Sequence, residues 1–167
     1  MLQSIDKKLI TFILILLLSS ISKSFGINLN EFNPDKGVVA LMYHRFNENK
    51  YPSTNIRNEI FSEHLDEINN SKFEFITFDK FNKIIKSKME KNYLLLTIDD
   101  GFESFYLNAW PTLKKKEIPF ILFVSTREVG KNGYMTWEQI KEIESSDLAT
   151  IGNHSHTHEY LIDWKEK

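Results

Sequence analysis

The alternation of apolar runs and amphipathic segments between residues 94 and 151 constrains the fold more than any other feature of this sequence. Apolar runs of strand length occupy residues 93–98, 120–124 and 148–151, and segments with helical spacing separate them. In the first of these helices Leu107, Trp110 and Leu113 are expected inside, Pro111 in the first turn or at a kink, and three lysines at the C-terminal end. This alternation predicts parallel strands with right-handed crossovers, an α/β fold.

The second helix and the region upstream extend the same pattern. Thr136 and Gln139 form a capping box, and the helix that it opens is expected to bury Trp137, Ile140 and Ile143. Upstream, the sequence predicts strands at 37–44 and 73–77 and two helices, which are marked by the apolar stripes Phe61-Leu65-Ile68 and Phe81-Ile84-Ile85.

Polar clusters follow two of the predicted strands. Asp99-Asp100-Gly101 comes directly after one strand, and Gly-Asn-His-Ser-His-Thr-His (152–158) begins where another is expected to stop. Because parallel strands place their carboxyl ends at one edge of the sheet, these clusters should meet there although more than fifty residues separate them.

This combination of side chains suits a metal ion. His154 and His158 are four residues apart, and one carboxylate of the Asp99-Asp100 pair completes a His₂-Asp set with a fourth position open for water. The remaining aspartate then acts as a general base or orients the water. His156 alternates away from its neighbours and is placed outside the metal shell. The alternative is that Asp-Asp-Gly is only a turn and the histidines are loop residues.

Composition restricts the class and location of the protein. The formal net charge of −2 gives no indication of a nucleic-acid partner, and the absence of cysteine excludes disulfides and thiolate metal sites. Lysines at 7 and 8, a short apolar run and a small-residue tail predict an export signal or an N-terminal anchor over residues 1–26, with no other stable membrane span. Residues 27–36 are expected to form a linker, and 37–167 the folded domain.

Two of these segments resemble a known family. Leu-Thr-Ile-Asp-Asp-Gly-Phe (96–102) is similar to the first signature of NodB-like polysaccharide deacetylases, carbohydrate esterase family 4, in which the pattern is Thr-Phe-Asp-Asp-Gly. His-Ser-His-Thr-His (154–158) is similar to the second signature, His-Ser/Thr-x-x-His. The segments 118–124 and 135–139 also resemble the family, and 41–46 resembles the opening strand of its poly-N-acetylglucosamine deacetylases.

The resemblance covers about residues 38–163, with its core signatures in 92–167, and it implies a fold, an activity and a location. The fold is a distorted (β/α) barrel, of which this sequence holds the first part. The activity is metal-dependent hydrolysis of N-acetyl groups on an amino-sugar polysaccharide, such as poly-N-acetylglucosamine, a chitin-like polymer or the peptidoglycan glycan. An exported protein of the periplasm, cell envelope or extracellular space is expected.

The resemblance also assigns roles within the site. It implies that Asp99 is the catalytic base and that Asp100, His154 and His158 are the metal ligands. Zinc is the metal that best suits this set, and cobalt, nickel or manganese would also fit it. His44 matches a position of undefined role and is a candidate for contact with the substrate.

The resemblance stops before the family's later signatures. An arginine that fixes the base, an aromatic groove wall and a late general-acid histidine have no counterpart after His158. The sequence is therefore interpreted as C-terminally truncated, with apolar strand faces left open. The alternative function is a catalytically impaired fragment, or a non-catalytic remnant that binds carbohydrate or metal.

Overall fold

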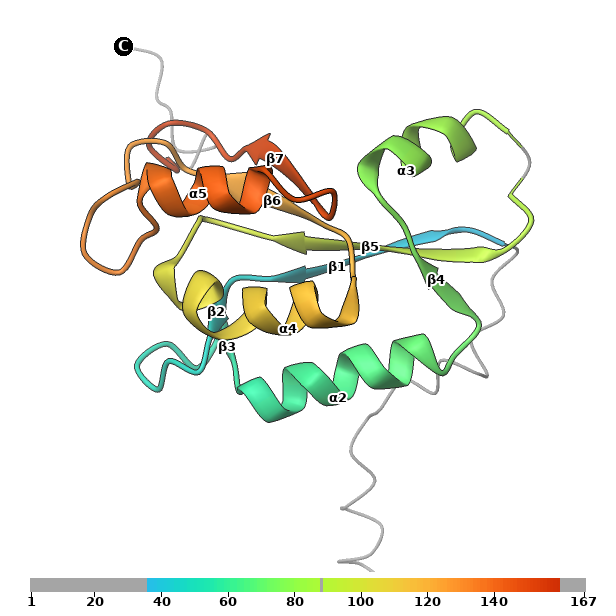
Figure 1. Cartoon of the computed structure of the whole chain (residues 1–167), viewed down its shortest axis with the longest axis horizontal. Coiled ribbons are helices and arrows are strands. Elements are labelled where there is room, and N and C mark those ends of the chain that lie inside the picture. Colours follow the sequence, from blue (N-terminus) through green and yellow to red (C-terminus); the bar gives the residue numbers. More distant parts are fainter. Residues whose placement is uncertain (1–35, 88, 160–167) are drawn as a thin grey trace, which may run out of the picture. The chain divides into compact units, whose positions relative to one another are not determined.

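A parallel five-stranded sheet forms the centre of the structure, which is a computed structural model that describes residues 36–87 and 89–159 (Figure 1). The predicted export signal and all but the last residue of the predicted linker lie outside the described residues. The strand order is β1-β5-β6-β7; β4 pairs with the first three residues of β5, and β6 pairs with its last two. The strands are β1 (Val38–Tyr43), β4 (Phe73–Phe75), β5 (Asn92–Ile98), β6 (Phe120–Val124) and β7 (Ala149–Asn153).

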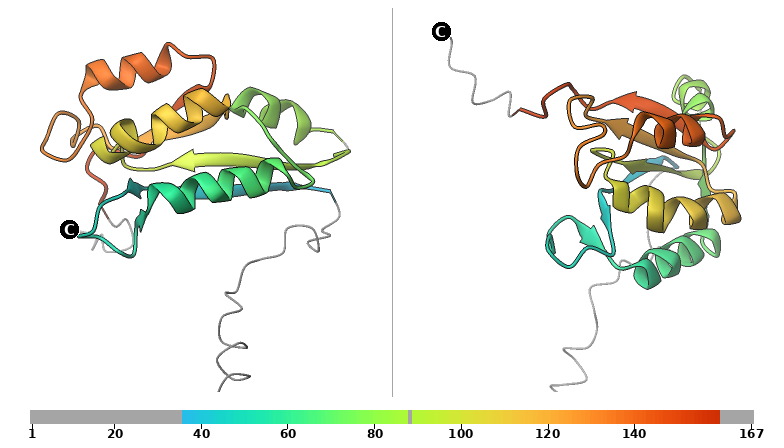
Figure 2. Two further views of the ribbon diagram at one scale, coloured as in Figure 1. Left: turned by 60° about the horizontal axis from the view of Figure 1, so that its bottom comes forward. Right: turned by 60° about the vertical axis from the view of Figure 1, so that its left-hand side comes forward.

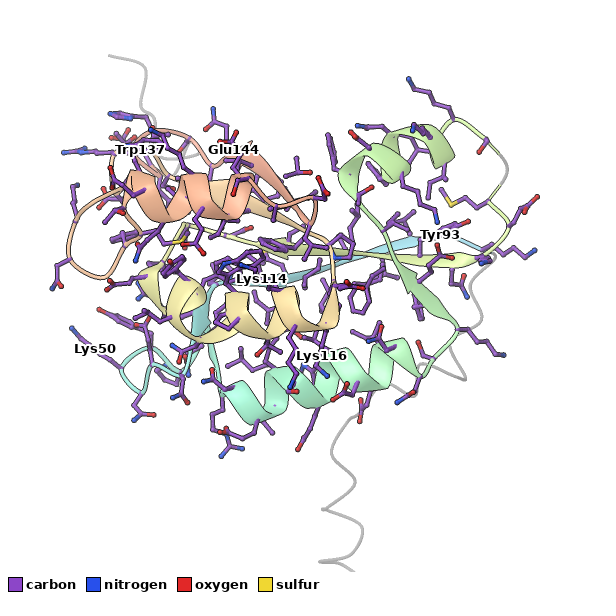
Figure 3. All side chains as sticks on the ribbon, in the orientation of Figure 1. Lys50, Tyr93, Lys114, Lys116, Trp137 and Glu144 are labelled. Carbon is purple, nitrogen blue, oxygen red and sulfur yellow. The ribbon has the colours of Figure 1, made fainter. Side chains whose placement is uncertain are left out.

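Helices cover this sheet along one face and at one end. Figures 1 and 2 show α2 (Asn58–Asn69), α4 (Trp110–Lys116) and α5 (Trp137–Glu144) in a row along one face of the sheet. The short helix α3 (Phe78–Ile84) lies at the end where β5 begins, near Tyr93, which Figure 3 labels. There Phe81 and Ile84 pack against a buried cluster that includes Tyr93, Leu95 and Ile121. Among the described residues, no helix is long and apolar enough to span a membrane.

The predicted strand–helix alternation and the parallel direction of the strands are confirmed. The capping box is also present: the Thr136 hydroxyl accepts a hydrogen bond from the Gln139 N–H, and the Gln139 side chain accepts one from the Thr136 N–H. Each bond satisfies an N–H group at this end of α5. The start of this helix can therefore be assigned from sequence.

For two residues the prediction of a buried position was wrong. Leu107 is 60% exposed because residues Phe105–Ala109 form a π-helix, η1, whose wider turns change the face that each position presents. Trp137 is 48% exposed because it is the first residue of α5, ahead of the stripe formed by Ile140 and Ile143. Pro111 is the second residue of α4, which follows η1 without a break, so its missing N–H group cannot continue the helical hydrogen-bond pattern at this junction.

A second, two-stranded sheet was not predicted. Strand β2 (Arg45–Phe46) pairs with β3 (Asn55–Ile56). The backbone of Phe46 is held on both sides, because its N–H donates to Ser104 Oγ (3.2 Å) and its carbonyl accepts from Asn108 Nδ2 (3.2 Å). The Phe46 side chain is fully buried. These contacts fasten the short sheet to the π-helix.

One exposed ion cluster joins β4 to its neighbours. The Glu74 carboxylate accepts hydrogen bonds from the ammonium groups of Lys80 and Lys91. These two hydrogen bonds lower the pKa of Glu74 below its ordinary value. The cluster lies where β4 pairs with the first residues of β5, at the opposite end of β5 from its carboxyl end.

Candidate metal centre

Three side chains from two separate segments of the chain meet at the carboxyl edge of the sheet. Asp100 Oδ1 lies 3.2 Å from His154 Nε2 and 3.3 Å from His158 Nε2. The two ring nitrogens are 3.1 Å apart. The structure therefore brings the predicted ligand set together as a nearly regular triangle of one oxygen and two nitrogens.

This triangle fits a divalent cation. Asp100 Oδ1 is buried and has no hydrogen-bond partner among the described residues. Three electron-pair donors so close together repel one another unless a positive charge lies between them. In a tetrahedral site with bonds of about 2.0–2.1 Å, the ligand atoms lie about 3.3 Å apart, and the observed 3.1–3.3 Å matches this spacing.

The turn that carries Asp100 is strained. Asp100 has φ = 73° and the following Gly101 has φ = 76°, so a residue with a Cβ adopts the left-handed region that favours glycine. Such a conformation costs about 1–3 kcal/mol and persists only where the surroundings hold it. Here the Met135 N–H donates to the Gly101 carbonyl (3.0 Å), and the Glu103 N–H donates to the Gly133 carbonyl (3.0 Å).

The histidine loop is held by the segment that follows β6. The His154 N–H donates to the Val124 carbonyl (3.0 Å), and the buried Ser125 hydroxyl donates to the His154 carbonyl (3.1 Å). Next along the chain, the Thr126 and Arg127 N–H groups donate to the carbonyls of residues 155 and 156. Ser155 (φ = 65°) and His158 (φ = 54°) both adopt the left-handed conformation. The loop is thus a second strained segment fixed by its neighbours.

The last predicted strand is longer than expected, and this affects the support of His154. Strand β7 continues to Asn153, so Gly152 lies within it. A Cβ on Gly152 would lie 2.5 Å from Cδ1 of Phe123, which shows that the phenyl ring rests directly on this glycine. The centroid of the same ring is 6.4 Å from that of the His154 ring. A glycine is therefore required here for close packing behind a candidate ligand.

Asp99 lies beside the triangle without belonging to it. Its side chain is 8% exposed, and its Oδ1 is buried without a hydrogen-bond partner among the described residues. Its N–H donates to the Tyr43 carbonyl (2.9 Å), which fixes the backbone at the end of β5. Burial raises the pKa of the Asp99 carboxyl, whereas the nearby rings of His154 and His44 oppose the rise.

The other histidines are separate from the triangle. His44 follows β1 and lies close enough to Asp99 to influence its pKa. His156 points elsewhere, since its Nδ1 shares a hydrogen bond with the Thr126 hydroxyl (2.9 Å). His64 shares a hydrogen bond with the hydroxyl of the half-buried Tyr43 (2.8 Å), and burial raises the pKa of Tyr43 to about 12.

Two pockets adjoin the site. The first has a volume of about 320 Å³ and is lined by Asp100, Phe102, Ser125, Glu128, Tyr134, Thr157 and His158. The second, of about 330 Å³, is lined by residues 42–44 and 53–56, and thus includes His44. No pattern in the sequence places Glu128 or Tyr134 here, since they belong to an irregular connection between β6 and α5. A pocket of mixed aromatic, hydroxyl and carboxylate character suits a small polar ligand.

An α/β sheet that presents two imidazoles, a carboxylate and a second, buried aspartate at its carboxyl edge has the donor set of a mononuclear catalytic metal site. Comparison with known proteins agrees with this class. Residues 86–167 match the family described as polysaccharide deacetylase. Over this segment the chain is similar to polysaccharide deacetylases, and its fold is a partial distorted (β/α) barrel of the NodB type.

Individual relatives make the comparison more specific. The chain is 32% identical over 89 residues to the poly-β-1,6-N-acetyl-D-glucosamine N-deacetylase of Staphylococcus aureus strain MSSA476, covering 52% of this chain and 29% of that protein. The solved structure of IcaB from Ammonifex degensii has a TM-score of 0.67 and 33% identity, covering 72% of this chain and 54% of that one.

More distant structures share the fold. The deacetylase PplD of Streptococcus pyogenes has a TM-score of 0.66 at 22% identity, covering 77% of this chain and 60% of that one. The chain spans less than half the length of the first curated relatives that it matches, 43% of one and 29% of another.

Proposed function

We propose that this chain contributes the catalytic centre of a metal-dependent hydrolase that removes N-acetyl groups from an amino-sugar polysaccharide. One observation carries the proposal: Asp100 Oδ1, buried and without a hydrogen-bond partner among the described residues, lies 3.2–3.3 Å from two imidazole nitrogens beside a second buried carboxylate. A structural turn gains nothing from placing these four groups together. An amide hydrolase needs a cation site and an adjacent base.

Asp100, His154 and His158 are the proposed ligands. Two imidazoles and one carboxylate suit Zn²⁺ best, and Co²⁺, Ni²⁺ or Mn²⁺ also accept this set. When bound, the cation supplies Lewis acidity toward the amide carbonyl and toward water. The clamped loop and turn hold their three donor atoms in place before any ligand arrives.

Asp99 is the proposed base. Its Oδ1 has no hydrogen-bond donor among the described residues, so this carboxylate oxygen is available to take a proton from attacking water. The backbone hydrogen bond from the Asp99 N–H to the Tyr43 carbonyl holds the residue in place. Burial, which raises its pKa, makes it a better proton acceptor than an exposed aspartate. His44, which is close enough to Asp99 to influence its pKa, is proposed to contact the substrate.

The substrate is proposed to be an N-acetylated glucosamine polymer. The 320 Å³ pocket opens beside Asp100 and His158 and has room for one sugar ring, with the Tyr134 hydroxyl and the Glu128 carboxylate able to bond to its hydroxyl groups. Poly-N-acetylglucosamine is the first polymer to test, because the S. aureus relative is named for it. Peptidoglycan and chitin-like chains are alternatives.

The organisation proposed for the whole chain is consistent with the same assignment. Residues 37–167 are proposed to be the NodB-like domain, preceded by the linker 27–36 and by an export signal or anchor over 1–26. Substrate polymers of this kind lie outside the cytoplasm, so we propose a periplasmic, cell-envelope or extracellular location.

The test is release of acetate by the purified chain. A β-1,6-linked N-acetylglucosamine oligomer and a chitooligosaccharide are incubated with the protein after chelation, with and without added Zn²⁺ or Co²⁺. We expect release that is abolished by the chelator and restored by the metal. In parallel, equilibrium dialysis should show one Zn²⁺ per chain.

Two variants in the same loop sharpen the test. His158→Ala should lose metal and acetate release together, whereas His156→Ala should retain the metal stoichiometry, because its ring bonds to Thr126 and not to the cluster. Folded protein that binds one metal but releases no acetate would favour the non-catalytic alternative. Equal metal binding in both variants would contradict the ligand assignment.

A further inference from the structure

The strained turn at Asp100 is held through Phe102 as well as through its own backbone. Phe102 follows Gly101 directly, is buried, and forms an antiparallel bridge with Tyr134. The two rings are in contact, with centroids 4.9 Å apart. Displacement of Phe102 would therefore release the turn that aims the Asp100 carboxylate.

The guanidinium group of Arg45, from another part of the chain, contacts the same ring. The guanidinium carbon of Arg45 lies 3.4 Å from the centre of the Phe102 ring and 4.0 Å from the centre of the Tyr51 ring. Its Nη1 donates to Glu48 Oε2 (2.9 Å), and the Arg45 side chain is only 15% exposed. A planar guanidinium can lie flat on aromatic rings while its edge donates hydrogen bonds, which an ammonium cannot do.

The backbone of Arg45 is itself anchored. Its N–H donates to the Thr54 carbonyl (3.0 Å), and the next residue, Phe46, is bonded on both sides to Ser104 and Asn108 of the π-helical region. The backbone from which the Arg45 side chain extends is therefore fixed, and the guanidinium at the end of that side chain packs on Phe102. In Figure 3, Lys50, in the loop between β2 and β3, and Trp137, at the start of α5, both lie toward the left-hand end of the view.

We infer that Arg45 is a positioning residue for the metal centre, which it serves by packing its guanidinium on Phe102 and so holding the left-handed turn at Asp100. This inference rests on the proposed function, because it concerns the ligand that Asp100 provides. It assigns Arg45 no contact with substrate or metal.

The test compares Arg45→Met with Arg57→Met in the full chain. Both changes remove one arginine charge, but Arg57 is exposed and distant from the turn in sequence. Zn²⁺ affinity is measured by competition with a chelating dye at a temperature well below the melting point of each variant. We expect the apparent Kd of Arg45→Met to rise about tenfold, as for other groups that orient metal ligands, and that of Arg57→Met to stay within about twofold of the unmodified chain.

Arg45→Lys is the second variant, in case Arg45→Met folds poorly. It keeps the charge but not the flat contact with the ring, so its Kd should lie between those of the unmodified chain and Arg45→Met. With Co²⁺ as the probe, the visible absorption of the bound ion should change in both Arg45 variants and not in Arg57→Met.

A readout that needs no metal separates this inference from the proposed function. Hydrogen exchange at the Met135 N–H, which bonds to the Gly101 carbonyl, should become about tenfold faster in Arg45→Met and stay unchanged in Arg57→Met. If the unmodified chain binds no metal, the proposed function fails, and exchange alone decides the role of Arg45. A lower melting temperature with unchanged exchange and unchanged Kd would show a purely structural role and overturn the inference.

Discussion

Gly152→Ala is expected to destabilise the protein and weaken its metal site together. The new methyl group would lie 2.5 Å and 2.6 Å from two carbons of the Phe123 ring. Carbon atoms pack at about 3.5–4.0 Å, so the ring must retreat by about 1 Å. Because both partners belong to neighbouring strands in register, Phe123 being paired with Gly152, the backbone cannot absorb this displacement cheaply.

The size of the effect depends on the exposure of the ring. Overpacking a core costs about 1–3 kcal/mol, and the half-buried Phe123 can relieve part of the clash by rotating outward. A loss of about 1–2 kcal/mol is therefore expected. For a domain of this size, each 1 kcal/mol lowers the melting temperature by about 3–5 °C. Since the ring lies next to His154, the apparent Kd for Zn²⁺ should also rise several-fold.

Thermal unfolding followed by circular dichroism, together with dye competition for Zn²⁺, measures both effects. Phe123→Leu provides the matched control, because a smaller side chain leaves room for the new methyl group. The double variant should be more stable than the sum of the two single losses predicts, with a coupling of about 1 kcal/mol. Additive losses, or a Gly152→Ala protein as stable as the unmodified chain, would refute the packing argument.

Three further changes test separate parts of the structure. Asp99→Asn should keep Zn²⁺ affinity within a few-fold but reduce acetate release by about 10²–10⁴-fold, as loss of a general base does; parallel loss of metal would contradict its separate role. Glu74→Gln should cost less than about 1 kcal/mol, because the cluster is exposed. Since folding lowers the pKa of Glu74, this contribution exists above its unfolded pKa and disappears as the pH falls through the folded value. Melting curves of the two proteins should therefore converge only where the pH lies below the lowered pKa of the folded-state Glu74. Thr136→Ala should cost about 1 kcal/mol through loss of the helix cap, with no change in Zn²⁺ affinity when the two are measured side by side.

The positions of the candidate ligands could be predicted from sequence because two strong signals coincide. The apolar run that ends at Asp99 is long enough to be read as a strand, and the residues immediately after parallel strands all lie at one edge of the sheet. The same reasoning placed the histidine segment at that edge. Topology and residue type are enough to infer that one carboxylate of the Asp99-Asp100 pair meets His154 and His158, whereas the choice of Asp100 came from the family resemblance.

The supporting residues were not accessible in this way. Arg45 and Tyr134 lie in segments without periodicity, and their roles depend on which loops pack together after the sheet forms. The π-helix had no sequence signal either, so Leu107 was assigned to the core by an α-helical spacing that does not apply to residues 105–109. Positive φ angles at Asp100, Ser155 and His158 are likewise products of tertiary contacts, because none of these residues adopts that conformation as readily as glycine does.

One connection explains how two strained segments can be aligned. Strand β6 lies between β5 and β7, so the chain that leaves its carboxyl end emerges between the aspartate turn and the histidine loop. The first residues of that connection, Ser125 to Arg127, bind the histidine loop, and its last residues, Gly133 to Met135, bind the aspartate turn. The geometry of the three donor atoms therefore depends on a segment that carries no ligand, which is why substitutions there are expected to weaken the site without touching it.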